Sequence, residues 1–97
     1  MPGKGYRLSP LAESDLEDIW RYTFETWSAD RADRYLRDLV AVFEDLAAGR
    51  KTGRPSDVRD GYLKHTASAH VVYFRRSDGW IEVIRVLHGR MDSDRHL

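Results

Sequence analysis

Side chains able to do chemistry gather in the second half of this chain, on apolar segments that resemble strands. Three of them are Arg75, Arg85 and His88. Cleavage of RNA by attack of its 2′-hydroxyl requires a general base, a general acid and cations that stabilise the developing charge. Together with His70, these residues could supply those roles if they met on one open face of a sheet.

The alternation of side chains along a strand argues against such a ribonuclease site. Successive side chains point to opposite faces, so His70 and Arg75 should lie on opposite faces of their strand. On the next strand, one face is expected to carry Ile81, Val83, Arg85 and Leu87, and the other Glu82, Ile84, Val86 and His88. Because both faces are largely apolar, we expect Arg75 and Arg85 to pair with Glu82 or solvent and His88 to cap its strand. RNA cleavage remains the alternative hypothesis.

Two further groups of polar residues could form binding sites. In the tail, Asp92, Asp94 and His96 alternate and could ligate a metal together with His88, but zinc needs three or four ligands on a rigid frame. The loop GRKTGRPSD carries Arg50, Lys51 and Arg54 beside two glycines and could hold an anion. It lacks the spacing of a nucleotide-binding loop, so direct contact with nucleic acid stays a secondary hypothesis. We expect no metal and no cofactor.

Composition limits the class of protein. The 97 residues are 41% hydrophobic and 33% charged, which is typical of a soluble globular chain and sufficient for one domain spanning 1–97. Cysteine is absent, which suits the reducing cytoplasm, and neither an export signal nor a membrane-spanning run is evident.

The charges are unevenly distributed along the chain. Residues 12–48 hold ten acidic and four basic residues, a balance of −6, whereas residues 49–97 hold ten basic and six acidic, a balance of +4. All four histidines lie in that second half. Such a separation bears on the choice of partner rather than on the fold.

The periodicity of apolar residues predicts the elements that position these side chains. A short strand in GYRLSP should end at Pro10, with Ser9 as the N-cap of a helix that reaches Trp27. Ser28 should cap a second helix that Gly49 ends. The apolar stripes of the two helices are expected to comprise Leu11, Ala12, Leu16, Ile19, Trp20, Thr23, Phe24 and Trp27, then Ala32, Tyr35, Leu36, Leu39, Val40, Phe43, Leu46 and Ala47.

After the loop at 49–57 the period changes from helical to alternating. VRDGYLKH, HVVYFRR and WIEVIRVLH are predicted to be strands, with a hairpin turn at Ser77-Asp78-Gly79. The predicted order is β-α-α-β-β-β. We therefore expect an α+β fold in which an antiparallel sheet carries an αα-hairpin on one face.

These segments, in this order, resemble the ParE toxins of the RelE/ParE superfamily. The resemblance rests on LSPLAESDLEDIWRYT, Trp27 at the hairpin turn, the Ala32–Tyr35 pair, GRPSDVRDGYLK, HVVYFRR and IRVLHGRMD. It implies a bacterial toxin of a type II toxin–antitoxin system that poisons DNA gyrase without catalysis of its own. It also implies a ParD-like antitoxin that wraps around the toxin. A superfamily member without toxic activity is a third hypothesis.

The resemblance also implies two binding surfaces. In ParE-like toxins the region after the last strand is linked with toxicity, which makes Arg90, Met91, Asp92, Arg95 and His96 candidates for contact with the target. Charged groups there would orient the complex, and Met91 would offer an adaptable apolar contact. Trp20, Trp27 and Tyr35 are expected to belong mainly to the core, and any exposed part of this stripe would receive the antitoxin.

Overall fold

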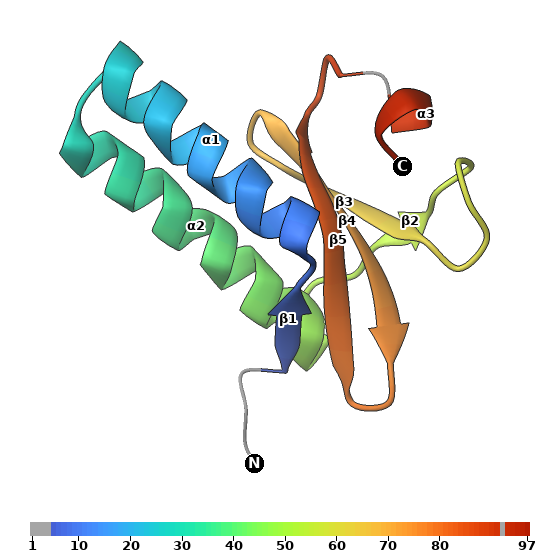
Figure 1. Cartoon of the computed structure of the whole chain (residues 1–97). Helices are drawn as coiled ribbons and strands as arrows, with labels where there is room; N and C mark the ends of the chain where they lie inside the picture. Colours follow the sequence, from blue (N-terminus) through green and yellow to red (C-terminus); the bar gives the residue numbers. More distant parts are fainter. Residues whose placement is uncertain (1–4, 92) are drawn as a thin grey trace.

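The computed structural model describes residues 5–91 and 93–97 and shows two long helices packed on a five-stranded sheet (Figure 1). The α+β class predicted from the sequence is confirmed. The elements in chain order are β1 (Tyr6–Leu8), α1 (Pro10–Thr26), α2 (Ala29–Ala48), β2 (Arg54–Pro55), β3 (Leu63–Ala67), β4 (His70–Ser77), β5 (Trp80–His88) and α3 (Ser93–His96).

The ends of the helical hairpin lie where the capping residues predict. The hydroxyl of Ser9 accepts a hydrogen bond from the amide of Ala12, and Pro10 occupies the first turn of α1. Ser28 caps α2 in the same way through the amide of Arg31. Gly49 ends α2 with φ at 82°, a conformation that glycine adopts without steric cost.

The sheet is mixed, whereas the sequence led us to expect an antiparallel one. Its strand order is β1-β5-β4-β3-β2, and all pairs are antiparallel except that β1 runs parallel to β5. The reason is that in the sequence the whole helical hairpin separates β1 from the other strands. So long a connection allows β1 to pair with β5 in either direction. The two-residue strand β2 also lies within the segment expected to be only loop.

An irregularity in β5 changes the predicted faces of that strand. Tyr73 pairs with Arg85 but its neighbour Phe74 pairs with Val83, so Ile84 is an extra residue in β5. The predicted face Ile81, Val83, Arg85, Leu87 is therefore wrong. Instead, the strand partners place Ile81, Val83, Val86 and His88 on the helix side, and Glu82, Arg85 and Leu87 on the far side.

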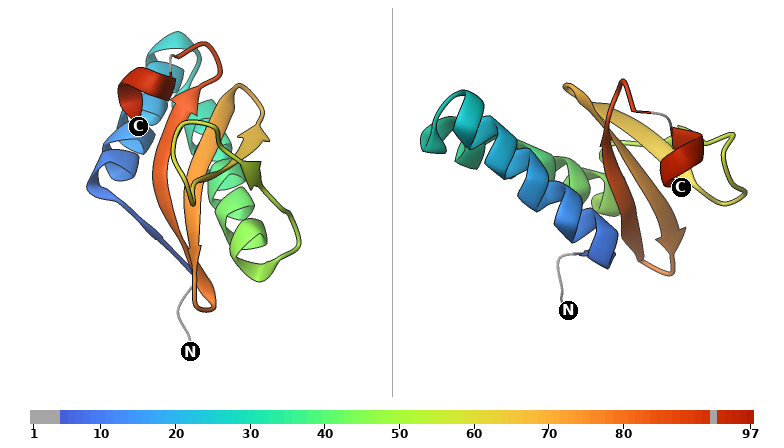
Figure 2. Two further views of the ribbon diagram at one scale, coloured as in Figure 1. Left: turned by 90° about the vertical axis from the view of Figure 1, so that its right-hand side faces the viewer. Right: turned by 45° about the horizontal axis from the view of Figure 1, so that its top comes forward.

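The core lies between the helices and one face of the sheet. It consists of buried side chains from both helices and the central strands: Ala12, Leu16, Leu39, Phe43, Leu46, Val72, Phe74, Ile81, Val83 and Val86. On the opposite side of the sheet lie α3 and the loop between β2 and β3 (Figures 1 and 2). Tyr73 and Leu87, which face that side, are also buried.

The hairpin is longer than the sheet that it covers. The far ends of α1 and α2 project beyond the strands (Figure 2), which leaves Phe24 and Trp27 of the predicted core stripe exposed. Leu11, at the start of α1, is exposed as well. Within the described residues, no helix is both long enough and apolar enough to cross a membrane.

Candidate partner-binding pocket and C-terminal segment

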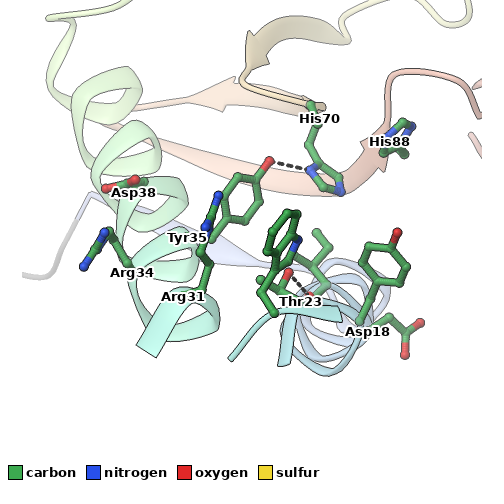
Figure 3. A pocket seen from close by; sticks show the side chains of 12 residues that line it. Asp18, Thr23, Arg31, Arg34, Tyr35, Asp38, His70 and His88 are labelled. Carbon is green, nitrogen blue, oxygen red and sulfur yellow. Dashed lines mark hydrogen bonds between the residues drawn. The ribbon is translucent and has the colours of Figure 1, made fainter. Parts of the chain in front are cut away.

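An open pocket of about 540 Å³ lies where the projecting end of the hairpin faces the turn between β3 and β4. Figure 3 shows Tyr35 of α2 pointing toward His70, with His88 beside it at the end of β5. The lining residues are Asp18, Ile19, Tyr22, Thr23, Trp27, Arg31, Arg34, Tyr35, Asp38, Ala69, His70 and His88.

The helix side of the pocket is aromatic and unusually accessible. Tyr22 and Trp27 are 68% and 63% exposed, respectively. The guanidinium of Arg31 lies 4.4 Å from the centre of the Trp27 ring, a cation–π distance. Large aromatic side chains exposed beside a pocket indicate a surface that binds another molecule.

The strand side of the pocket is a hydrogen-bonded aromatic cluster. The hydroxyl of Tyr35 lies 2.7 Å from Nδ1 of His70, and the rings of His70 and His88 meet edge to face at 5.4 Å. Burial raises the pKa of Tyr35, so this phenol stays protonated at neutral pH. Burial, followed by the neighbouring His88, lowers the pKa of His70. The neutral imidazole can then accept a hydrogen bond from the hydroxyl of Tyr35.

Charges of both signs surround the pocket. Arg31 and Arg34 of α2 line it together with Asp18 of α1 and Asp38 of α2. The balance of two cations and two carboxylates gives no strong preference for an anion such as phosphate. The arrangement is better suited to an amphipathic protein segment that inserts an apolar side chain and pairs its own charges around the rim.

Of the three aromatic residues predicted to bind an antitoxin, the structure brings together Trp27 and Tyr35 but not Trp20. The indole of Trp20 donates to Asp33 and stacks on Phe24, with ring centres 5.2 Å apart. Trp20 lines a separate groove between the helices together with Leu16 and Leu36. The hairpin therefore has two distinct aromatic surfaces.

The three residues considered for RNA cleavage are not assembled into one site. Arg75 pairs with Glu82 at 3.0 Å, as expected for a structural arginine. Arg85 binds Asp15 of α1 at 2.8 Å rather than Glu82 or solvent. His88 stabilises the turn after β5, because its Nδ1 accepts from the amide of Arg90 and its carbonyl accepts from the amide of Met91.

The sequence did not predict two side-chain contacts in this region, that of His70 with His88 and that of Asp15 with Arg85. It placed His88 on the face opposite to the side chains of Ile81 and Val83, so the pairing of His70 with His88 was not anticipated. It also gave no role to Asp15, which appeared as one of several acidic residues in the first turns of a helix. A carboxylate so near a helix N-terminus needs no tertiary partner to explain it, so no local signal identified Arg85 as its partner.

The residues predicted to contact a target lie in and around α3. Arg90 and Met91 are exposed in the turn after β5, and Arg95 is exposed in α3. His96 is partly buried, and its carbonyl accepts a hydrogen bond from Arg85. Asp92 lies outside the described residues.

Most of the possible metal and anion ligands make other contacts in the structure. His88 and His96 belong to different contacts, and no group of three His, Cys, Asp or Glu side chains converges within residues 5–91 and 93–97 as far as they are described. In the basic loop, Arg50 pairs with Asp45 at 2.8 Å and Arg54 belongs to β2. Lys51 is exposed.

Comparison with known proteins agrees with the fold and with the order of motifs. Residues 6–93 match the family described as the ParE toxin of the type II toxin–antitoxin system parDE. Toxin ParE1 of Mycobacterium tuberculosis is 45% identical over 95% of this chain and 96% of its own length. Toxin ParE1 of Caulobacter vibrioides is 40% identical over 97% of this chain and 98% of its own.

Solved structures share the architecture at lower identity. A chain of the chromosomal ParDE system from P. aeruginosa superposes with a TM-score of 0.75 at 22% identity, covering 87% of this chain and 94% of that one. A chain of the YoeB–YefM complex from Staphylococcus aureus superposes with a TM-score of 0.52 at 14% identity, covering 86% of this chain and 93% of that one.

Proposed function

Because this chain belongs to the ParE toxin family of type II toxin–antitoxin systems, we propose that it poisons DNA gyrase by binding it in the cytoplasm. A ParD-like antitoxin neutralises it. The match to the toxin family over residues 6–93 carries this proposal. Supporting it, Arg75 and Arg85 are engaged in ion pairs instead of facing His88 across an open site.

The proposed contact with gyrase uses the C-terminal segment from Arg90 onward. Arg90, Met91 and Arg95 present charged and apolar groups at the surface, and Asp92 and His96 complete the set carried over from the resemblance. Exposed charges orient an encounter, while methionine adapts its shape to a partner surface.

The first experiment is a supercoiling and DNA-cleavage assay of purified gyrase with the toxin added. We expect loss of supercoiling activity or trapped cleavage complexes, with RNA on translating ribosomes left intact in a parallel reaction. Unimpaired gyrase in the presence of folded toxin would contradict the proposed target.

The proposed antitoxin contact is the pocket between Trp27 and Tyr35, with Trp20 contributing from the neighbouring groove. An amphipathic antitoxin segment would place an apolar side chain against Trp27 and Tyr22 and match its charges to Arg34 and Asp18. A segment disordered before binding could cover both aromatic surfaces of the hairpin.

Replacement of Trp27 tests this contact. Trp27→Ala should weaken antitoxin binding by about 2 kcal/mol or more, as expected for a central aromatic anchor, measured by titration calorimetry. Leu11→Ala is the matched control, because Leu11 is a 57% exposed apolar residue in α1, the helix that Trp27 follows, but lies outside the pocket. Equal affinities of the two variants would contradict the placement.

RNA cleavage remains a second candidate because of one observation: two imidazoles lie 5.4 Å apart in an open pocket. Such a pair could act as general base and general acid. A double variant, His70→Ala with His88→Ala, separates the proposals. RNA cut by the native chain and left intact by this variant would support catalysis and contradict the gyrase mechanism.

A further inference from the structure

Arg85 connects parts of the molecule that lie on opposite sides of the sheet. We propose that Arg85 is a positioning residue that holds the C-terminal segment in the arrangement needed to engage the target. This inference rests on the proposed function, because it assigns to that segment the contact with gyrase.

The first half of the connection is a two-pronged ion pair with α1. Nε and Nη2 of Arg85 donate to the two carboxylate oxygens of Asp15, each at 2.8 Å. The exposed fractions of the two side chains are 13% and 12%. This geometry fixes the plane of the guanidinium, because both prongs must be satisfied together.

The second half is a hydrogen bond to the C-terminal segment. Nη1 of Arg85 remains available after the ion pair forms, and it donates to the carbonyl of His96 at 3.0 Å. Arg59, in the loop on the same side of the sheet, donates to the main-chain oxygen of Leu97 at 3.4 Å. The shorter of these two hydrogen bonds is the one from Arg85, and Asp15 orients the guanidinium that donates it.

The edge of the sheet explains why this connection occurs at Arg85. β1 pairs with β5 only from Ile81 to Val83. Beyond Val83, backbone groups at this edge of β5 form hydrogen bonds with side chains at the start of α1. Ser9 donates to the carbonyl of Ile84 at 2.7 Å, and Asp15 accepts from the amide of Val86 at 2.9 Å. The extra residue in β5 turns Arg85 to the far side of the sheet, where α3 lies (Figures 1 and 2).

Only arginine can make this set of contacts. Its planar group presents two donors to a carboxylate and a third donor in another direction, whereas a lysine ammonium is a point charge that cannot bridge all three acceptors at fixed angles. A segment held in place before binding loses less conformational freedom when it meets a partner. Loss of the anchor should therefore weaken target binding without altering the surface groups that make the contact.

The test compares Arg85→Lys with the native toxin in three measurements. We expect amides of residues 93–97 to exchange hydrogen about tenfold faster, and about tenfold more toxin to be required for half-inhibition of gyrase. Affinity for the antitoxin should change by less than about twofold, because the pocket at Trp27 does not include Arg85.

Two controls separate positioning from general loss of stability. Arg75→Lys alters an exposed arginine that pairs with Glu82 of β5. This variant should leave all three measurements unchanged. Gly53→Ala would place a β-carbon 2.6 Å from Cζ of Phe74 and is expected to destabilise the core. It should keep full inhibition at a temperature at which it remains folded. If Arg85→Lys does not fold, Asp15→Asn weakens the same contact from the helix side with little change in shape, and the same three measurements apply.

The outcomes distinguish this inference from the proposed function. Unchanged exchange at residues 93–97, or faster exchange with full gyrase inhibition, would overturn the positioning role. A native toxin that leaves gyrase active would overturn the proposed function, whereas the exchange measurement would still show whether Arg85 holds the segment.

Discussion

At the scale of single residues, polar side chains in this protein are placed so that each buried group has a partner. Among the described residues, no buried side-chain nitrogen or oxygen lacks a hydrogen bond. Asp15 illustrates the principle, since its two oxygens accept from Arg85 and from the amide of Val86. A buried carboxylate left without such donors would cost free energy that the fold could not recover.

Among the glycines of the described residues, Gly53 has the least room for a β-carbon. A β-carbon there would lie 2.6 Å from Cζ of Phe74 and 3.1 Å from the carbonyl of Lys64. Phe74 is fully buried, so its ring cannot move aside without disturbing the core. Gly53→Ala should lower the free energy of unfolding by about 1–3 kcal/mol, measured by urea denaturation.

Gly89→Ala is the matched control for Gly53. A β-carbon at Gly89 would meet only the carbonyl of Ala69 at 3.5 Å, an ordinary contact. Its effect should stay within about 0.5 kcal/mol. Equal losses in the two variants would contradict the packing argument.

His70 should make stability depend on pH. Its pKa is lowered in the folded state by burial and then by His88, while the charge of Asp15 acts in the opposite direction. Other charged groups that line the same pocket are Arg31, Arg34, Asp18 and Asp38. Below the ordinary histidine pKa of about 6.5, the unfolded chain binds the proton more readily than the folded chain, so stability falls as pH decreases.

The measurement is the free energy of unfolding at pH 7.5 and at pH 5.5. The native chain should lose more stability over this interval than His70→Gln, in which the titrating group is absent. An identical loss in both chains would show that other groups dominate the pH dependence.

At the scale of elements, the first helix begins with a residue that serves two structures at once. Ser9 caps α1 through the amide of Ala12 and also donates to the carbonyl of Ile84 in β5. The hydroxyl of Ser28 caps α2 by accepting from the amide of Arg31, a bond within the first turn of the same helix. The start of α1 is therefore tied to the sheet, whereas the start of α2 is at the projecting end of the hairpin.

Replacing these two serines should have unequal effects. Ser28→Ala should cost about 1 kcal/mol, the usual value of a helix N-cap. Ser9→Ala should cost about 1–2 kcal/mol more, because the carbonyl of Ile84 loses its donor in a part-buried site. Urea denaturation of both variants compares them, and equal losses would show that water replaces the hydroxyl at Ile84.

At the scale of the whole molecule, the two sides of the sheet are covered by different parts of the chain. The acidic helical hairpin covers one side and contributes the core, while the loop before β3 and the C-terminal α3 lie on the other side (Figures 1 and 2). Tyr73 and Leu87 are 7% and 1% exposed there. The C-terminal segment is tied to the sheet by the hydrogen bond that Arg85 donates to the carbonyl of His96.

Deletion of residues 93–97 should consequently affect both stability and activity. We expect a lower melting temperature, since Arg85 and Arg59 lose their acceptors at His96 and Leu97, together with loss of gyrase inhibition. The double variant Arg90→Ala, Met91→Ala should lose inhibition but keep its melting temperature within about 2 °C. Both side chains are exposed, and the hydrogen bond lost, from the amide of His88 to the sulfur of Met91, has a weak acceptor. Calorimetry and the supercoiling assay measure the two effects, and full inhibition by both variants would contradict the proposed contact.

Much of the fold could be predicted because its signals are local. The boundaries of α1 and α2 follow from Ser9, Pro10, Ser28 and Gly49, whose effects reach only a turn along the chain. The strands at β4 and β5 follow from alternating apolar residues and the Asp78-Gly79 turn. The resemblance to ParE toxins rests on the same segments, and the family match over residues 6–93 confirms it.

The candidate site was predicted less well because its contacts join distant segments. The pairing of Tyr35 with His70 spans 35 positions, and that of Asp15 with Arg85 spans 70. Trp20 and Trp27 have the same residue type and helical spacing, yet one binds Asp33 and the other lines the pocket. Periodicity alone could not separate them. Whether a position of the hairpin is covered depends on how far the sheet extends beneath it, and the sequence of the hairpin does not contain that information.

The sequence by itself determined the class of fold and the limits of the helices, because caps, turns and hydrophobic periods act between near neighbours. The ParE family was indicated by resemblance of its motifs, and the family match shows it. Only the tertiary structure decided that β1 runs parallel to β5, that an extra residue reverses the faces of β5, and that His70 therefore meets His88. It also decided that Arg85 joins Asp15 to the carbonyl of His96. The physical reason is that one inserted residue in a strand moves every following side chain to the other face, and only the register with the neighbouring strand reveals it.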